Sequence, residues 1–224
     1  MNDFLNTFFN LEILRQVSPL LIEGFWMTLR LAAVAIPLSL ILGAVIAVAQ
    51  DTRSRLLRGL IVAYVDLMRA IPPLVLLIFI FYGLPMMGLS FGEFSAAVLA
   101  LVLNGSSYFS EIFRAGLESV PNGQREAARS TGMSWAQSTL HVILPQGVRN
   151  VLPDLISNTV ELAKQTSIAS VVALQELLRG AQIAQGLTYN TTPLVVAALV
   201  YFIIFWPFVR LISPAFQRSA SPTK

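Results

Sequence analysis

Cysteine is absent from this 224-residue chain, and histidine occurs once, as His141. Without cysteine the chain can form neither a disulfide framework nor a thiolate metal site, and a single imidazole is too few to build a zinc centre. The sequence also lacks a Gly-x-x-x-x-Gly-Lys-Ser/Thr loop, with which many proteins hold the phosphates of ATP. We therefore expect no metal, no cofactor and no ATP hydrolysis in this chain, and we expect His141 to be a surface residue of a loop.

Charged residues are also scarce, at 12% of the chain against about a quarter in an average soluble domain. Hydrophobic residues make up 55%, and the mean hydropathy is +0.70. Four long runs contain no charged residue: Leu31–Gln50, Ala70–Gly92, Phe94–Ser110 and Gly180–Val209. A helix needs roughly 20 apolar residues to cross the hydrocarbon core of a bilayer. A buried core helix would explain one such run but not four, so the sequence predicts an integral membrane protein.

We predict an all-α fold with five transmembrane helices, at residues 20–50, 71–89, 94–115, 148–172 and 193–212. The fourth is the least hydrophobic, because Asp154, Glu161 and Lys164 interrupt it. Pro72 and Pro73 should break any helix that runs into the second span, since proline lacks a backbone N–H and clashes with the preceding turn. A short interfacial helix over residues 54–68 can precede this break.

The two ends of the chain carry few signals. Residues 1–18 contain Asp3, Glu12 and Arg15 rather than the basic start of a cleavable signal peptide, so we expect an extracytoplasmic segment there. The transmembrane domain then covers residues 19–214. A cytoplasmic tail follows over residues 215–224, and we expect its end, Ser219–Lys224, to be disordered.

Lysine and arginine lie mostly on one side of the predicted spans. The first and third loops and the tail hold ten of them: Arg53, Arg55, Arg58, Arg114, Arg125, Arg129, Arg149, Arg210, Arg218 and Lys224. The opposite side holds only Arg15 and Arg179. Because cytoplasmic loops carry the excess of basic residues, this distribution predicts an extracytoplasmic N-terminus and a cytoplasmic C-terminus.

The third loop, at about residues 120–146, is long and rich in turn and cap signals. A turn at Pro121-Asn122-Gly123 should lead into a short helix over residues 124–130. Gly132 suits the left-handed position that follows a helix end. These signals alone fit two interpretations equally well. The loop is either an amphipathic connector on the lipid surface or a rigid element that passes a push from a partner to the spans.

A second short helix should follow Gly132 in this loop. Ser134 and Gln137 form a capping-box pattern, which marks the first turn of a helix. Pro145 should stop this second helix, because a proline inside a helix removes a backbone hydrogen bond.

Three parts of the loop carry a more specific pattern: Glu126-Ala127-Ala128, then Gly132, then Ile143-Leu144-Pro145. The spacing of all three resembles the EAA loop of ABC importer permeases. In that family the loop forms a coupling helix, which docks in a cleft of the cytoplasmic ATPase subunit. The resemblance therefore implies coupling to an ATPase through Gly123, Glu126, Ala127, Ala128, Gly132, Ile143, Leu144 and Pro145.

Other segments resemble the polar amino acid subfamily of these permeases, which includes histidine, glutamine and glutamate/aspartate permeases. They are Tyr64–Pro72, Phe81–Pro85, Ser107–Gly116 and Lys164–Ser167, and the resemblance covers roughly Thr28 to Phe208. The chain departs from the subfamily pattern at Ala70-Ile71, at Gln165 and at Ser157-Asn158. Since these positions lie near the expected pathway, they leave the identity of the substrate open.

The resemblance implies a type I ABC importer permease fold and a multi-pass subunit of the bacterial plasma (inner) membrane. It implies transport of polar amino acids or close analogues, with no catalysis by the chain itself. The expected partners are an ABC ATPase dimer that binds ATP and Mg, a second identical or homologous permease, an extracytoplasmic substrate-binding protein and membrane lipid. Nucleic acid is not an expected partner.

Ionisable residues within the spans need a cavity or a partner, because they are costly in the bilayer. Glu161 and Lys164 stand three residues apart on one helix face, where they can pair. They either line a substrate pathway, together with Thr166 and Ser167, or form a structural pair within one subunit or between two. Arg69 is either an interfacial residue whose head reaches water or a gate of the pathway.

Two further polar groups of the third span point to structure rather than to substrate. Glu111 and Arg114, also three apart, should form an ion pair that anchors the base of the loop. Asn104, Ser106 and Ser107 suit a helix-packing face, where small and hydroxylated residues are frequent.

Other classes of membrane protein remain as alternatives. A self-sufficient channel or secondary transporter would need a filter or coupling carboxylates within the spans, and Glu161 is the one candidate. An intramembrane enzyme would need a Ser/Lys, Asp/Asp or His/Glu metal constellation, and the predicted spans show none.

Overall fold

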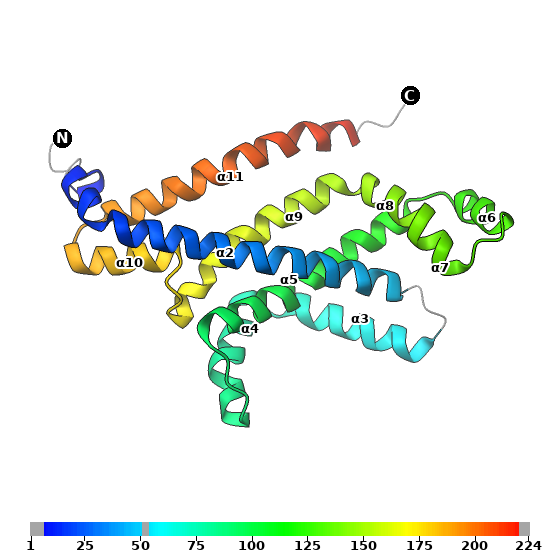
Figure 1. Ribbon diagram of the computed structural model, residues 1–224, viewed down its shortest axis with the longest axis horizontal. Coiled ribbons are helices and arrows are strands. Elements are labelled where there is room, and N and C mark those ends of the chain that lie inside the picture. Colours follow the sequence, from blue (N-terminus) through cyan, green and yellow to red (C-terminus); the bar gives the residue numbers. More distant parts are fainter. Residues whose placement is uncertain (1–6, 51–53, 220–224) are drawn as a thin grey trace. The chain divides into compact units, whose positions relative to one another are not determined.

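The computed structural model of the protein describes residues 7–50 and 54–219, with side chains as far as Arg210, and over these residues it is all-helical (Figure 1). The predicted all-α fold is thus confirmed. The chain divides into two compact units. Among the described residues, unit 1 comprises 7–37, 71–101 and 160–211, and unit 2 comprises 38–50, 54–70, 102–159 and 212–219. The predictions for residues 1–6, for Arg53 and for residues 220–224 lie outside the described residues.

Three long helices contain the first, third and fifth predicted spans. They are α2 (Leu11–Gln50), α5 (Glu93–Glu118) and α11 (Thr192–Ser219). Each provides a segment long and apolar enough to cross a membrane. The 40 residues of α2 span about 60 Å at 1.5 Å per residue, roughly twice the thickness of a hydrocarbon core. Helix α2 begins before the predicted first span, and α11 continues past the predicted fifth span into the predicted tail.

The break predicted at Pro72 and Pro73 is confirmed. Helix α3 (Arg55–Ala70) ends before the prolines, and α4 (Pro73–Ile78) begins at the second one, with Pro72 extended at φ −57° and ψ 136°. A π-helical turn η1 (Phe79–Gly83) and a 3-10 turn η2 (Leu84–Met87) follow. These segments satisfy the length and hydropathy requirements of a membrane span only when they are counted together as one broken span.

The predicted fourth span is divided into three helical pieces: α8 (Leu144–Asn150), α9 (Leu152–Gln165) and the 3-10 helix η4 (Thr166–Val172). Ala173 then takes a left-handed conformation, with φ 62°, and ends this path. Within the described part of the chain, three helices are long and apolar enough to cross a membrane, or four with the broken pair. The five-span count and the orientation therefore stay predictions.

In unit 1, the short helix α10 (Leu177–Thr188) packs on the N-terminal part of α2. The buried core around this contact is apolar and built largely of small side chains: Val17, Leu21, Leu177, Ala181, Ala184 and Ala197. A Cβ added at Gly24 would lie 2.8 Å from the carbonyl oxygen of Glu176, and one at Gly180 would lie 2.9 Å from that of Leu20. Small residues at these contacts let the two helix backbones approach closely.

Unit 2 is also packed through small residues. A Cβ added at Gly116 of α5 would lie 2.7 Å from the carbonyl oxygen of Gly147 in α8, so these two helices touch backbone to backbone. The Asn104 amide donates to the carbonyl of Met68 at 2.7 Å, which ties α5 to the end of α3. Both Ser106 and Ser107 are fully buried, in accord with the packing role expected of them.

Candidate functional site

The first helix of the loop, α6 (Asn122–Ser130), begins directly after Pro121, close to the predicted turn and helix. Glu126 and Ala127 are exposed on it, whereas Ala128 is 6% exposed and packs into unit 2. Gly123 lies in open space near the helix start, because an added Cβ would meet nothing within 4 Å. One face of α6 therefore holds the loop to its own unit, and the Glu126–Ala127 face points outward.

The predicted left-handed glycine and capping box are both confirmed. Gly132 has φ +88°, and its N–H donates to the carbonyl of Arg129 at 3.0 Å. The backbone N–H of Gln137 donates to the Ser134 hydroxyl at 3.3 Å, and the Gln137 side chain accepts from the Ser134 N–H at 2.9 Å. Two short helices are thus joined at a corner whose left-handed backbone favours glycine.

The prediction that Pro145 stops the second helix is wrong. Helix α7 (Trp135–Ser138) passes through a π-helical segment η3 (Thr139–Ile143) directly into α8, where Pro145 occupies the first turn. Proline is tolerated in a first turn because its missing N–H has no helical partner there, and a π-bulge relieves the ring's clash with the preceding turn. The loop therefore runs as continuous helical structure into the fourth predicted span.

The three C-terminal residues of the motif lie at different depths. Ile143 is 1% exposed, Leu144 is half-buried and Pro145 is exposed. His141 is exposed, as expected, and its Nδ1 lies 3.0 Å from the carbonyl of Gln137. The C-terminal end of the loop is therefore held in unit 2 by the buried side chain of Ile143 and by the backbone contact between α8 and α5.

A cluster of charges lies at the end of α5 in unit 2. The Arg114 guanidinium contacts Glu111 at 2.9 Å and Glu118 at 2.7 Å, so the predicted pairing of Glu111 with Arg114 is confirmed. Arg69, from the end of α3, lies 3.6 Å from the same Glu111 carboxylate and over the ring of Tyr108 at 5.5 Å. Glu111 therefore links the arginine before the proline break to the helix that leads into the loop.

The pairing predicted for Glu161 and Lys164 is also confirmed, on the C-terminal part of α9, which belongs to unit 1. About half of each side chain is exposed. Lys164 and Ser167 line a cavity of about 450 Å³ whose opposite wall is formed by α11, through Tyr201, Phe202, Phe205, Trp206 and Val209. Thr166 is fully buried, and its hydroxyl donates to the carbonyl of Ala163 at 2.7 Å, so it contributes no wall to this cavity.

Sequence reasoning missed Glu176, which is fully buried in unit 1. Its carboxylate accepts hydrogen bonds from the N–H groups of Leu178 and Arg179, at 2.9 and 2.8 Å, and from the hydroxyl of Tyr201 at 2.9 Å. Burial raises the pKa of this carboxyl, against the opposing effect of the three hydrogen bonds. Glutamate is not a favoured helix-capping residue. Only its position just before an apolar helix could have drawn attention to it.

The Glu176 carboxylate connects the start of α10 with the wall of the cavity, because Tyr201 also lines that cavity. The neighbouring N–H of Leu177 donates to the hydroxyl of Thr28 on α2 at 3.1 Å. Tyr201 is therefore held by a buried acceptor at one side while its ring faces the space near Lys164. The pathway residues expected from the sequence fall in both units: Arg69 belongs to unit 2 and the other four to unit 1.

Comparison with known proteins identifies several relatives. The probable glutamine ABC transporter permease protein GlnP of Bacillus subtilis (strain 168) is 37% identical over 186 residues, which cover 81% of this chain and 85% of GlnP. The arginine transport system permease protein ArtQ of the same organism is 33% identical over 188 residues, which cover 83% of this chain and 86% of ArtQ.

The fold has counterparts among solved structures. An amino acid ABC transporter crystallised with histidines superposes with a TM-score of 0.81 at 35% identity, over 92% of this chain and 96% of that one. The MetNI methionine ABC transporter in an inward-facing conformation shares the fold, with a TM-score of 0.70 at 21% identity. Residues 35–219 match the family described as the inner membrane component of binding-protein-dependent transport systems. The chain belongs to this family of binding-protein-dependent transport system inner membrane components.

Proposed function

We propose that the chain is the permease subunit of an ATP-driven importer of polar amino acids or close analogues. The observation that carries the proposal is the geometry of the loop, an exposed Glu126–Ala127 face on a short helix that a left-handed Gly132 joins to a capped second helix. The names of the relatives, a glutamine and an arginine permease, support the substrate class.

The loop passes force from a separate ATPase to the membrane helices. An ATPase dimer holds ATP and Mg, and the exposed face of α6 docks in a cleft of one ATPase subunit. Because α7, η3 and α8 form one helical path and α8 touches α5 at Gly116, movement of the loop displaces two membrane helices together. The chain itself performs no catalysis.

Transport requires two permease copies, identical or homologous, in a plasma membrane with the N-terminus outside and the C-terminus in the cytoplasm. An extracytoplasmic binding protein delivers the substrate. The half-exposed Glu161–Lys164 pair offers a zwitterion one charge of each sign, next to a cavity of about 450 Å³ that is large enough for one amino acid. Ser167 adds a hydroxyl to this cavity, and Arg69 acts at the proline break as a gate paired with Glu111.

Replacement of Gly132 tests the coupling. A β-branched residue at φ +88° costs about 1–2 kcal/mol, so Gly132→Val should distort the corner between α6 and α7. Gly132→Asn should be milder, since asparagine tolerates this conformation. Gly59→Val serves as the matched control, because Gly59 lies in α3 of the same unit and an added Cβ meets nothing within 4 Å.

The measurement is ATP-driven uptake into proteoliposomes that contain the chain, its ATPase and its binding protein. We expect Gly132→Val to lose most uptake while still co-purifying with the ATPase, and Gly132→Asn and Gly59→Val to retain it. Normal uptake by Gly132→Val contradicts the coupling role. Uptake by the chain alone in ATP-free vesicles would instead favour the channel or secondary transporter.

A further inference from the structure

A groove in unit 2 lies between the end of α2, the start of α3 and the loop, and the proposed function leaves it unused. Its volume is about 990 Å³, at the upper end of the roughly 300–1,000 Å³ typical of ligand pockets. Of the described residues that line it, eight are apolar and the other two are Arg58 and Arg129. An apolar trough with two guanidinium groups is complementary to a ligand that combines a hydrocarbon chain with an anion.

The uncharged end of α2 indicates that the groove lies near the edge of the hydrocarbon layer. The uncharged run Leu31–Gln50 has 20 residues, which as helix span about 30 Å and match the thickness of a hydrocarbon core. Val45 and Val48 belong to the last two turns of this run and line the groove. Whatever fills the groove is therefore placed where lipid acyl chains meet their headgroups.

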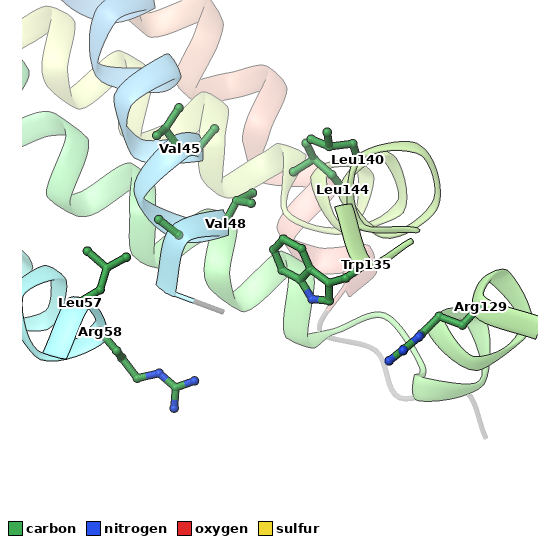
Figure 2. Close-up of a pocket in the computed structure, with 10 residues that line it drawn as sticks. Val45, Val48, Leu57, Arg58, Arg129, Trp135, Leu140 and Leu144 are labelled. Carbon is green, nitrogen blue, oxygen red and sulfur yellow. The ribbon is translucent and has the colours of Figure 1, made fainter. Parts of the chain in front are cut away.

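The apolar side chains that line the groove come from α2, from α3 and from the loop. Val45, Leu57 and Leu140 are 59%, 45% and 52% exposed, so the described residues leave a large part of their surface uncovered. Figure 2 shows the indole of Trp135 on the side of the loop that faces Val48, beside Leu140 and Leu144. Tryptophan favours the boundary between hydrocarbon and headgroups, which agrees with this placement.

The two arginines reach the groove from different elements. Arg58 projects from the first turns of α3, and its Nε donates to the carbonyl of Gln50 at the C-terminal end of α2, at 3.2 Å. Arg129 projects from α6, and Figure 2 shows its guanidinium directed from the loop toward the groove. Guanidinium groups bind phosphate through paired hydrogen bonds, which a single ammonium group cannot reproduce.

We propose that this groove binds an anionic phospholipid, with an acyl chain along Val45, Val48 and Leu140 and its anionic headgroup attracted by Arg58 and Arg129, which stand on opposite sides of the groove in Figure 2. The lipid joins the end of the first membrane helix to the loop. The proposal goes beyond the transport function, because it assigns a membrane lipid of one headgroup class to a defined site. The test must distinguish a lipid in this groove from an ATPase surface or a second permease copy that covers it.

The test uses Trp135 as a reporter of lipid contact. Trp26→Phe and Trp206→Phe leave it as the only tryptophan of the chain. This variant is assembled with its ATPase in nanodiscs that contain either brominated phosphatidylglycerol or brominated phosphatidylcholine at the same low mole fraction. Bromine quenches tryptophan fluorescence only at close range. Two arginines, each worth about fivefold toward an anionic lipid, should enrich phosphatidylglycerol roughly 25-fold at the site.

We expect clearly stronger quenching by the brominated phosphatidylglycerol, and loss of this preference in the double variant Arg58→Gln/Arg129→Gln. The matched control is Arg55→Gln/Arg149→Gln, which removes the same charge from exposed positions of unit 2 that do not line the groove. It should keep the preference. Equal quenching by the two lipids, or an unchanged preference in the first double variant, overturns the proposal. So does quenching that appears without the ATPase and disappears once the ATPase is bound, since the ATPase then covers the groove.

Discussion

Replacing Glu176 with alanine should loosen unit 1 at the start of α10, far along the chain from the coupling loop. The carboxylate is fully buried and accepts three hydrogen bonds, two from the backbone of α10 and one from Tyr201. Alanine removes all three acceptor contacts at once. The helix loses its cap, and the Tyr201 hydroxyl loses its carboxylate acceptor.

The magnitude follows from these contacts. Loss of a helix N-cap costs about 0.5–2 kcal/mol, and the net loss of one buried hydrogen bond costs about 0.5–1.5 kcal/mol. Together they give about 1–3.5 kcal/mol for Glu176→Ala, which is roughly a 5- to 300-fold increase in local opening. Tyr201→Phe removes only the hydroxyl contact and should cost about 1 kcal/mol.

Hydrogen exchange measured by mass spectrometry is the assay, because it reports the opening of individual segments in a detergent-solubilised membrane protein. The peptide that covers α10 should exchange much faster in Glu176→Ala, and the loop helices of unit 2 should be unchanged. The double variant Glu176→Ala/Tyr201→Phe should cost less than the sum of the two single changes, because both remove the same hydrogen bond.

Glu23→Ala is the matched control, since Glu23 lies on α2 in the same unit and is exposed. It should stay within about 0.5 kcal/mol of the unchanged protein. Exchange of α10 at the normal rate in Glu176→Ala would refute the reasoning. Additive costs for the two substitutions would refute the coupling between Glu176 and the cavity wall.

Three further changes have defined outcomes. Because burial raises the pKa of Glu176, its folded form holds the proton more tightly than the unfolded chain does. Its contribution to stability is complete below the unfolded pKa of about 4.3 and is lost as the pH rises through the folded pKa. The melting temperature should therefore fall over that range, and this fall should be absent in Glu176→Gln. The charge swap Glu161→Lys/Lys164→Glu should keep uptake if the pair is structural, and should reduce uptake or change substrate preference if the pair meets the substrate, as competition assays would show. Gly116→Leu should prevent a stable unit 2, because its Cβ would lie 2.7 Å from the backbone of Gly147, and size-exclusion chromatography should show aggregation.

The parts of the loop that follow from local chemistry could be predicted from the sequence. A capping box involves residues three apart, so Ser134 and Gln137 carry the whole signal between them. The prediction for Gly132 depends only on the backbone conformation of that residue. The prediction of a break at Pro72 and Pro73 depends only on the geometry of the proline ring. In each case the interaction energy is set within one turn of the chain.

The features that sequence reasoning missed depend on residues far apart. Burial of Glu176 arises from the packing of α10 on α2 and from Tyr201, which lies 25 residues further on. Nothing in the residues next to Glu176 indicates that its carboxylate is covered. The contact between Gly116 and Gly147 is similar, because a glycine in an apolar helix does not indicate which helix approaches it.

Pro145 shows how a local rule is overridden. The rule assumes a uniform α-helix, in which the N–H that proline lacks would have bonded to the carbonyl four residues earlier. The π-helical turn over Thr139–Ile143 changes that register, so a new helix begins at Leu144 and places Pro145 where no N–H is needed. Ile143, at 1% exposure, holds the turn against unit 2. A helix that continues through this proline gives the loop a stiff connection to α8, which a chain break at the same point would not have provided.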